Sequence, residues 1–288
     1  MRAVYLKELR SYFTTPLGYV FMAFMLVLFG IYFMLYGLIY QNSDYSYVLD
    51  AVTLLILFAL PLLTMRMFSE EMKNKTDQLL FTSPIKIWKI VMGKYLAALT
   101  LFTLALVITM LQPIVLSALG GSVPIQKVAG GYIGFFLYGC CFTAIGMLIS
   151  SMTENQLVAA IASIGVFMLI FLLDGIATML PTSRAFALGV VILAALIVAF
   201  LIYRAIRDIY VTGIVAVVCI GAAVLLFFFV PSVYDNLLVN VADWCSLVTR
   251  YSDFYTGVFD FSNVVFYASF TGFVVFLTMQ VIEKRRWS

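Results

Sequence analysis

The side chains that most often perform catalysis are scarce in this sequence. It contains no histidine, which excludes Ser-His-Asp triads, HExxH zinc sites and imidazole bases. Its four cysteines do not have the spacing of metal ligands, because Cys140 and Cys141 are adjacent in one apolar run, Cys219 lies in another, and Cys245 is isolated. Free cysteines of this kind are usually small buried packing residues. We therefore expect a non-catalytic chain without a metal site.

A nucleotide-binding loop is also absent. The only Gly-Lys pair, Gly93-Lys94, is followed by Tyr95 and is preceded five residues earlier by Trp88. A P-loop requires a serine or threonine at the first of these positions and a glycine at the second. The chain is therefore not expected to bind ATP or any other cofactor itself.

Ion-coupled transport usually requires ionisable side chains inside the membrane. Asp174 is the one clear candidate, and it lies near the outer end of its apolar run, where an interfacial or helix-packing role is favoured about two to one. Gln112-Pro113 most simply marks a bend in a helix. A secondary transporter therefore remains only the second hypothesis, and a non-transporting membrane assembly subunit the third.

The elements that hold these residues are membrane spans. Hydrophobic residues make up 64% of the 288 residues and charged residues 11%, and many apolar runs are close to the roughly 20 residues that a helix needs to cross a bilayer. The runs do not alternate as barrel strands would. The sequence predicts an all-α polytopic membrane protein with eight spans, at 18–40, 49–67, 90–118, 129–150, 156–180, 186–203, 210–230 and 263–282.

Lysine and arginine favour the cytoplasmic side. With the N-terminus inside, all but three of the 17 basic residues lie inside, the exceptions being Lys127, Arg184 and Arg250. Six aspartates collect on the opposite side: Asp44, Asp50, Asp235, Asp243, Asp253 and Asp260. We expect a multi-pass protein of the bacterial plasma membrane with both termini in the cytoplasm.

The pair of spans within 186–230 is the least certain, because only Arg204 to Asp208 separates two apolar runs. Six spans would also leave both termini inside. The segment 231–262 would lie outside, either as a gate or partner contact or as an interfacial hairpin that closes the tops of the spans, with the second slightly favoured.

The longest polar interruption, 68–89, is predicted to form a short amphipathic helix. Its apolar side comprises Phe68, Met72, Leu79 and Leu80, interrupted by Lys75, and its polar side comprises Glu70, Glu71, Lys73, Asp77 and Gln78. Ser83 would cap the next helix, with Pro84 in its first turn. A solvated helix lying on lipid headgroups explains the amphipathic pattern about equally well.

Residues 1–17 repeat this design. Tyr5, Leu9, Tyr12 and Phe13 share one helical face, with Lys7 and Arg10 opposite. Such a helix is expected at the inner membrane interface, ending at Thr15-Pro16, a cap followed by a first-turn proline. Further along, Thr153 with Gln156 has the spacing of a capping box.

The segment "MRMFSEEMKNKTDQLLFTSPIKIWKIVMGKYLA" resembles the coupling segment of ABC-2 type permeases, in which paired acids precede Gly-Thr and an "ELLLTSP"-like run leads to "GK". The corresponding residues here are Glu70, Glu71, Thr76, Leu79, Leu80, Thr82, Ser83, Pro84, Gly93 and Lys94. Lys75 stands where that family has glycine. The start "LKELRSYFTTPLGYV" and the turn "SSMTENQLVAA" are similar to further parts of the same family.

The C-terminal stretch is similar to the branch that includes gliding-motility and nitrous-oxide-reductase maturation permeases. The matching residues are Phe254, Gly257, Asp260, Tyr267, Arg286 and Trp287. The apolar pair 186–230 departs from that family's plan of six spans. The resemblance implies a type V exporter-like transmembrane domain with an added hairpin.

The resemblance further implies the partners. Two copies of a separate ATPase subunit, which hold ATP and magnesium, would dock on the coupling segment, and a second permease chain, identical or related, would complete the pathway. Glu70, Glu71 and Asp77 would meet basic residues of the ATPase. Leu79, Leu80 and Phe81 would fill its groove. An extracytoplasmic accessory membrane protein and membrane lipid are further expected partners, whereas nucleic acid is not.

Overall fold

The computed structural model describes residues 1–76, 85–179, 183–184, 186–193, 196, 221, 227, 234–235, 237, 239–240 and 246–287. Every regular element in these ranges is helical, as predicted. The chain forms two compact units, one of Met1–Phe171 with Leu247–Ser288 and one of Leu172–Ser246. The first unit contains nearly all the described side chains.

Helices follow one another along most of the described chain. They are α1 Arg2–Thr14, α2 Pro16–Tyr32, the π-helix η1 Phe33–Ile39, α3 Ser46–Thr64, α4 Ser69–Lys73, α6 Ile87–Thr109, α7 Leu111–Ala118, α8 Ile125–Ser150, α9 Gln156–Met179, α13 Leu247–Thr256 and α14 Phe261–Trp287.

Five of the predicted spans coincide with helices that are long and apolar enough to cross a membrane. These helices cover Pro16–Ile39, Ser46–Lys73, Ile87–Ala118, Ile125–Ser150 and Phe261–Arg286. The predicted span 156–180 coincides with α9, whose searched apolar part, Gln156–Leu172, is shorter. The predicted pair 186–203 and 210–230 lies largely outside the described residues. The chain is therefore a multi-pass membrane protein.

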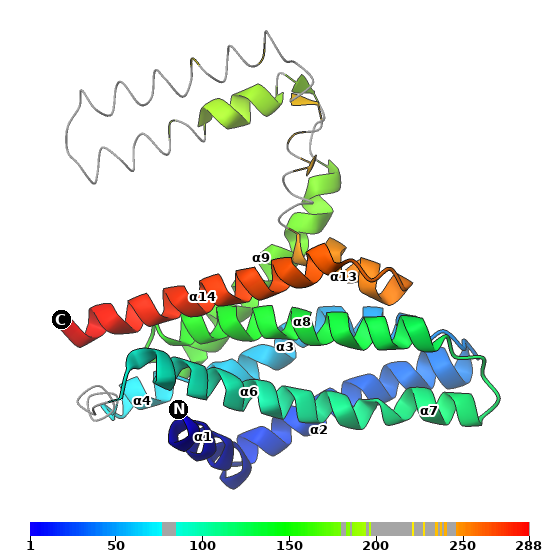
Figure 1. Ribbon diagram of the computed structural model, residues 1–288, viewed down its shortest axis with the longest axis horizontal. Coiled ribbons are helices and arrows are strands. Elements are labelled where there is room, and N and C mark those ends of the chain that lie inside the picture. The colour runs from blue at the N-terminus through cyan, green and yellow to red at the C-terminus, as the bar shows by residue number, and fades with distance from the viewer. Residues whose placement is uncertain are drawn as a thin grey trace. The chain divides into compact units, whose positions relative to one another are not determined.

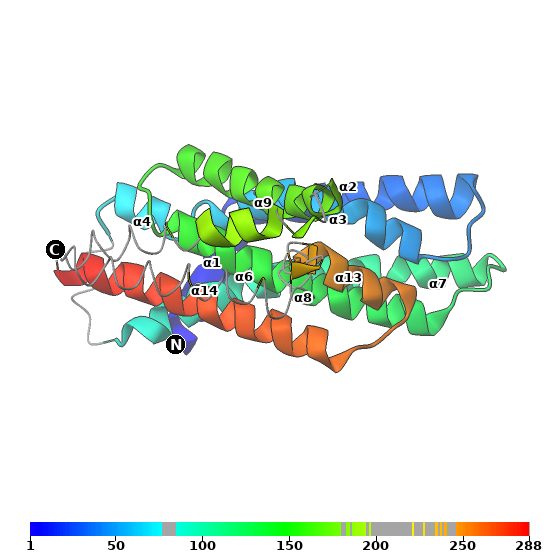
Figure 2. The same ribbon diagram turned by 90° about the horizontal axis from the view of Figure 1, so that it is seen from above.

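Helix α8 is central to the first unit and packs against α3, α6, α13 and α14 (Figure 1). Figure 2 shows α14 running along α8 from a second direction. Two glycines permit this close packing, because a Cβ on Gly139 would overlap the ring of Phe102 and one on Gly146 would overlap Thr64. Small residues at such crossings are typical of helices that associate within lipid.

A single residue separates α1 from α2. Thr15 has an extended backbone (φ −99°, ψ 152°), and Pro16 occupies the first turn of α2, as predicted. The Thr15 hydroxyl does not cap α2, however, but donates to the carbonyl oxygen of Ser11 at 2.8 Å. The turn is tight enough that a Cβ on Gly18 would overlap the carbonyl oxygen of Tyr12.

Two predicted helix starts are wrong. Helix α6 begins at Ile87, with Lys86 as its extended N-cap, so Pro84 is not in its first turn. Helix α9 begins after Asn155, whose side-chain oxygen accepts a hydrogen bond from the Leu157 amide at 3.0 Å. Asn155 therefore takes the capping role predicted for Thr153, because a short amide side chain reaches the second amide of the helix directly.

Part of the segment 231–262 is helical and buried. Leu247, Tyr251 and Phe254 of α13 are at most 2% exposed and pack in the core of the first unit. Gly134 of α8 lacks the Cβ that would overlap Phe254, and the Tyr267 hydroxyl donates to the Leu247 carbonyl oxygen. The end of this segment is therefore part of the helical core of the first unit.

The two ends of the first unit differ in charge. Both termini and α4 lie at one end (Figure 1). There Lys7, Arg66 and Lys94 pair with the acids of α4, and the last turn of α14 contains Lys284, Arg285 and Arg286. At the other end Lys127 pairs with Asp44 at 2.9 Å. Burial would raise the pKa of Asp44, but hydrogen bonds from Ser46 and Lys127 outweigh it and lower that pKa below its usual value. We call the first end the basic end.

Candidate coupling site at the basic end

A cluster of opposite charges joins three helices at the basic end. The carboxylate of Glu71, on α4, lies 3.1 Å from Lys94 Nζ of α6 and 3.2 Å from Lys7 Nζ of α1. Glu8, also on α1, approaches Lys94 Nζ at 3.0 Å. Two carboxylates and two ammonium groups therefore balance. We name Lys7, Glu8, Glu71 and Lys94 the ionic joint.

Lys94 is the buried centre of the ionic joint. Its side chain is 2% exposed, whereas those of Glu8 and Glu71 are 13% exposed and that of Lys7 is 60% exposed. A lysine is almost never this deeply buried unless it is paired. The ring of Phe68 adds a cation–π contact to Lys94 Nζ at 5.2 Å. Lys94 is therefore the residue that needs the ion pairs of the joint most.

A close crossing of α1 over α6 brings the ionic joint together. A Cβ on Gly93 would lie only 3.0 Å from the side chain of Val4. Further along the same crossing, the hydroxyls of Tyr5 and Thr100 are hydrogen-bonded at 3.0 Å. Gly93 thus permits the approach of α1, and Lys94 holds it in place electrostatically.

Lys7 closes the exposed side of the joint. Partial burial by itself would lower the pKa of Lys7, but the charges and hydrogen bonds of Glu71 and Glu8 outweigh it and raise that pKa above its usual value. Lys7 therefore stays charged at neutral pH. Its exposure means that solvent screens its contribution.

Arg66 links the end of α3 to the α1–α2 turn. Its guanidinium donates to Thr15 Oγ1 at 2.9 Å and to Ser11 Oγ at 2.6 Å, and it lies over the ring of Tyr12. Its Nε is 3.3 Å from a carboxylate oxygen of Glu70. Both acids of the Glu70-Glu71 pair are therefore paired within the chain.

On the opposite side, the hydroxyl of Ser150 attaches α4 to the end of α8. Ser150 Oγ accepts from the Phe68 amide at 3.1 Å and from the Ser69 amide at 3.3 Å, and it donates to the Met65 carbonyl oxygen at 3.0 Å. Ser69 and Ser150 are fully buried. One buried hydroxyl thus satisfies the backbone of the α3–α4 turn.

The C-terminal end of α14 reaches the same turn. Arg285 donates to the carbonyl oxygen of Met152 at 3.1 Å, just beyond the end of α8, and its guanidinium also contacts the sulfur of Met72 on α4. Helices from both ends of the chain therefore surround α4.

A polar cavity of about 190 Å³ opens among these residues and is lined mainly by the ionic joint, Arg66 and Glu70. Within the described ranges, no group of three or more histidine, cysteine or acidic side chains is placed to hold a metal ion. The interactions that the site contains are ion pairs and hydrogen bonds between helices.

Part of this site lies in a segment of the chain that matches a known protein family. Residues 39–230 match the family model described as ABC-2 family transporter protein, which is two thirds of the chain. The chain belongs to the ABC-2 transporter family. None of the curated proteins matches it. As an ABC-2 transporter it is a membrane permease, and this family in general works with an ABC ATPase.

The family region contains Glu71 and Lys94 but neither Lys7 nor Glu8. The ionic joint therefore connects the ABC-2 region to the N-terminal helix that precedes it. Tyr5, Leu9, Tyr12 and Phe13, predicted to share one face of that helix, do pack against the core: Tyr12 is buried and the other three are half-buried.

The predicted coupling helix is shorter than expected. Helix α4 ends at Lys73, and Lys75 has a left-handed backbone with φ 55°, so a continuous helix through Lys75 is wrong. Such a conformation favours glycine, the residue of the family pattern that this segment resembles. Lys75 therefore adopts the backbone turn that glycine would favour.

The residues of the predicted coupling helix differ in where they lie. Glu71 faces the ionic joint, which gives it an internal role, whereas Glu70 is 42% exposed and Thr76 is exposed at the surface. Phe68 and Met72, from the predicted apolar side, are buried in the core. The remaining candidates lie outside the described residues: Asp77, Leu79, Leu80, Phe81, Thr82, Ser83 and Pro84.

Glu8, Arg66 and Ser150 were not predicted to have a role in this site, and Lys94 was named only as a match to the family pattern. A signal existed for Lys94, because a charge so close to an apolar run requires a partner. Ser150 had no signal, since its role depends on where the α3–α4 turn meets α8.

Proposed function

We propose that the chain is the permease subunit of an ATP-driven ABC-2 exporter and that the segment 68–89 receives the movement of a separate ATPase subunit. The observation that supports this most is the ionic joint. Through it, Glu71 of α4 is attached to both α1 and α6. A displacement of α4 would therefore move two further helices.

The attachments on the two sides of α4 differ in kind. On one side, the charges of the ionic joint can exchange partners as helices slide. On the other, Ser150 bonds directly to backbone groups of the α3–α4 turn. Helix α6 continues with α7 as far as Ala118, so movement at Lys94 would reach the opposite end of the membrane span. This arrangement suits a lever that transmits force supplied by the ATPase.

The orientation follows from the distribution of charge. We place the basic end, with both termini, in the cytoplasm of a bacterial plasma membrane, because basic residues favour that side. Two ATPase copies, with ATP and magnesium, would then face two permease chains, identical or related. An accessory protein would contact the opposite end.

An eight-span topology is part of the proposal. In the unit Leu172–Ser246, Arg184 forms two hydrogen bonds with the carboxylate of Asp235. These residues flank the predicted hairpin 186–230. Their contact supports a hairpin, because it holds the two ends of that segment together. A cysteine at residue 206 should react with an impermeant reagent only from the cytoplasmic side; reaction from outside alone would contradict eight spans.

We also place the chain in the branch of gliding-motility and nitrous-oxide-reductase maturation permeases. The matching C-terminal residues have structural roles here: Phe254 packs under Gly134, Gly257 has a φ of 94°, and the Tyr267 hydroxyl bonds to α13. They fix α13 between α8 and α14, which explains why such a motif would be shared.

The direct test is co-purification with a P-loop ATPase subunit produced in the same cells. Leu80→Asp should abolish recovery of the ATPase, because a charge would replace an apolar docking side chain. Leu119→Asp is the matched control, since Leu119 is 67% exposed at the opposite end. Equal recovery with both variants would overturn the docking assignment. Transport that follows a proton gradient and ignores ATP depletion would overturn ATP coupling.

A further inference from the structure

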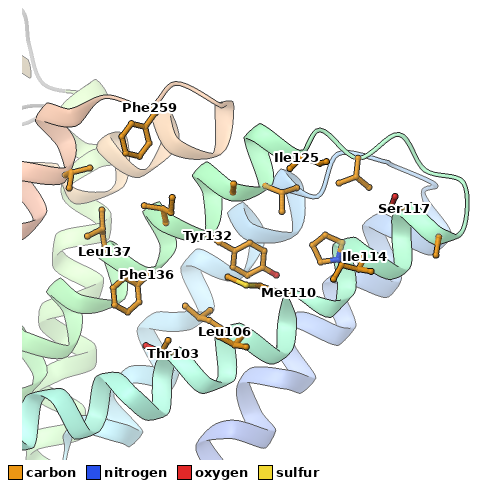
Figure 3. A pocket seen from close by; sticks show the side chains of 18 residues that line it. Thr103, Leu106, Met110, Ile114, Ser117, Ile125, Tyr132, Phe136, Leu137 and Phe259 are labelled. Carbon is orange, nitrogen blue, oxygen red and sulfur yellow. The ribbon is translucent and has the colours of Figure 1, made fainter.

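A large apolar groove lies far from the ionic joint, on the side of α6, α7 and α8 near the opposite end of the bundle. Its volume is about 1010 Å³. Figure 3 shows side chains of α6 and α7, such as Leu106 and Ile114, facing Tyr132 and Phe136 of α8 across this space. We propose that this groove binds an acyl chain of a membrane phospholipid.

The third span is interrupted at a single residue, Met110, which lines the groove. Helix α6 ends at Thr109 and α7 begins at Leu111. Pro113 explains the position of the break, because a proline removes one backbone hydrogen bond and its ring clashes with the carbonyl four residues earlier, here that of Thr109. As a result α6 packs against α8, but α7 does not pack closely on it.

The side chains that line the groove are mostly apolar. The polar groups beneath them already have partners: the Tyr132 hydroxyl donates to Tyr45 at 3.2 Å, and the Tyr45 hydroxyl donates to Gln112 at 2.7 Å. Thr103 Oγ1 donates to the carbonyl oxygen of Leu99 at 2.7 Å. A polar ligand would lose its hydration here without replacement hydrogen bonds, whereas an acyl chain requires none.

The location and shape favour lipid over a second copy of the chain. The groove lies within two helices that are apolar enough to cross a membrane, Ile87–Ala118 and Ile125–Ser150, so hydrocarbon surrounds it. Its rims bear large side chains, with Val107 54%, Ile114 64% and Ile125 79% exposed. Helices in lipid associate closely through small residues. A flexible chain fills an irregular space between large side chains better than a rigid helix does.

The first test is lipid retention by the full chain. The protein is purified in mild detergent with palmitoyl-oleoyl phosphatidylglycerol, and bound lipid is counted by native mass spectrometry. Ala129→Phe would fill the groove, since Ala129 lines it; Ala162→Phe, on the exposed face of α9, is the matched control. We expect retention to fall about tenfold in A129F, the effect of excluding about two methylene groups, and to be unchanged in A162F.

Equal retention in both variants would overturn the proposal. A dimer that is lost in A129F while its lipid is retained would assign the groove to a second copy, and would overturn the proposal as well. The lipid site does not depend on the proposed ATP coupling, so neither result bears on that function.

A second measurement guards against misfolding of A129F. A single tryptophan is placed in the groove by Phe136→Trp, in a chain in which Trp88, Trp244 and Trp287 are phenylalanine. Phosphatidylglycerol with brominated acyl chains should quench it saturably at low lipid content. The control Phe273→Trp, at a 58% exposed position of α14, should be quenched only in proportion to total brominated lipid. The same linear dependence at both positions would also overturn the proposal.

Discussion

Replacing Lys94 with methionine should destabilise the folded chain more than any other single change in the ionic joint. Lys94 is the only buried cation there, and it is about 3 Å from both Glu8 and Glu71. Methionine has a similar length and no charge, so the space remains filled. The variant therefore isolates the electrostatic role of the ammonium group.

The magnitude follows from the geometry. Because both carboxylate oxygens lie about 3 Å from the same nitrogen, they are within about 6 Å of each other. Without Lys94 their repulsion is roughly 3 kcal/mol at an effective dielectric constant of about 20. Loss of the two attractions is partly offset, because Lys94 no longer has to be desolvated. Breaking a buried pair in this way typically costs about 3–5 kcal/mol, which is our expected loss of unfolding free energy.

The assay compares Lys94→Met with a charge-balanced double variant. Unfolding is measured in mixed micelles by far-UV circular dichroism at increasing denaturing detergent. Adding Glu71→Gln removes one of the two repelling carboxylates and leaves Lys7 with Glu8, so the double variant should be more stable than Lys94→Met alone. Lys73→Met, an exposed change on α4, should alter stability by less than about 0.5 kcal/mol.

The decisive quantity is the coupling between the two substitutions. We expect the double variant to depart from additivity by about 2–3 kcal/mol, near the upper end for residues in one network. If the two effects add within about 0.5 kcal/mol, the charges are not coupled, and the ionic joint does not hold α4 to α6 as described.

Three further predictions use the same unfolding measurement. Ser150→Ala should cost about 1–3 kcal/mol, because it leaves buried backbone groups unpaired, whereas Ser150→Thr, which keeps the oxygen, should cost clearly less; equal losses would contradict the hydroxyl's role. Lys75→Gly should be neutral or stabilise by up to about 1–2 kcal/mol, the penalty of a left-handed residue, and a clear loss would show that Lys75 is not left-handed. The lowered pKa of Asp44 means that its ionised form stabilises the fold above the usual pKa of 3.8 and that this contribution is lost as pH falls through the lower folded-state value. Asp44→Asn should therefore be less stable than wild type at neutral pH but equal to it in acid, and a difference that persists in acid would contradict the Asp44–Lys127 pair.

The spans could be predicted from sequence because they depend on composition over about 20 residues. Five predicted spans coincide with apolar helices of sufficient length, and α1 has its predicted apolar face toward the core. The first-turn position of Pro16 was likewise predicted, since the fixed φ of proline acts locally.

Helix ends were predicted less well where several residues offered similar signals. Asn155 and Thr153 can both accept an amide hydrogen bond, and only the path of the chain selects Asn155. Similarly, an amphipathic pattern continued through Lys75, but the backbone turns there with a positive φ. A pattern of apolar residues does not specify where a helix stops.

The sequence by itself determined that this is a membrane protein, because its apolar runs require a lipid environment. It also showed that the basic residues gather at one end and that the motifs resemble one family. Only the tertiary structure decided the partners of its charges. Glu71 and Lys94 are 23 residues apart, and Glu8 is 63 residues before Glu71, so no local pattern connects them. Burial of Lys94 makes pairing obligatory, and the crossing of α1 over α6 at Gly93 determines which carboxylates supply it.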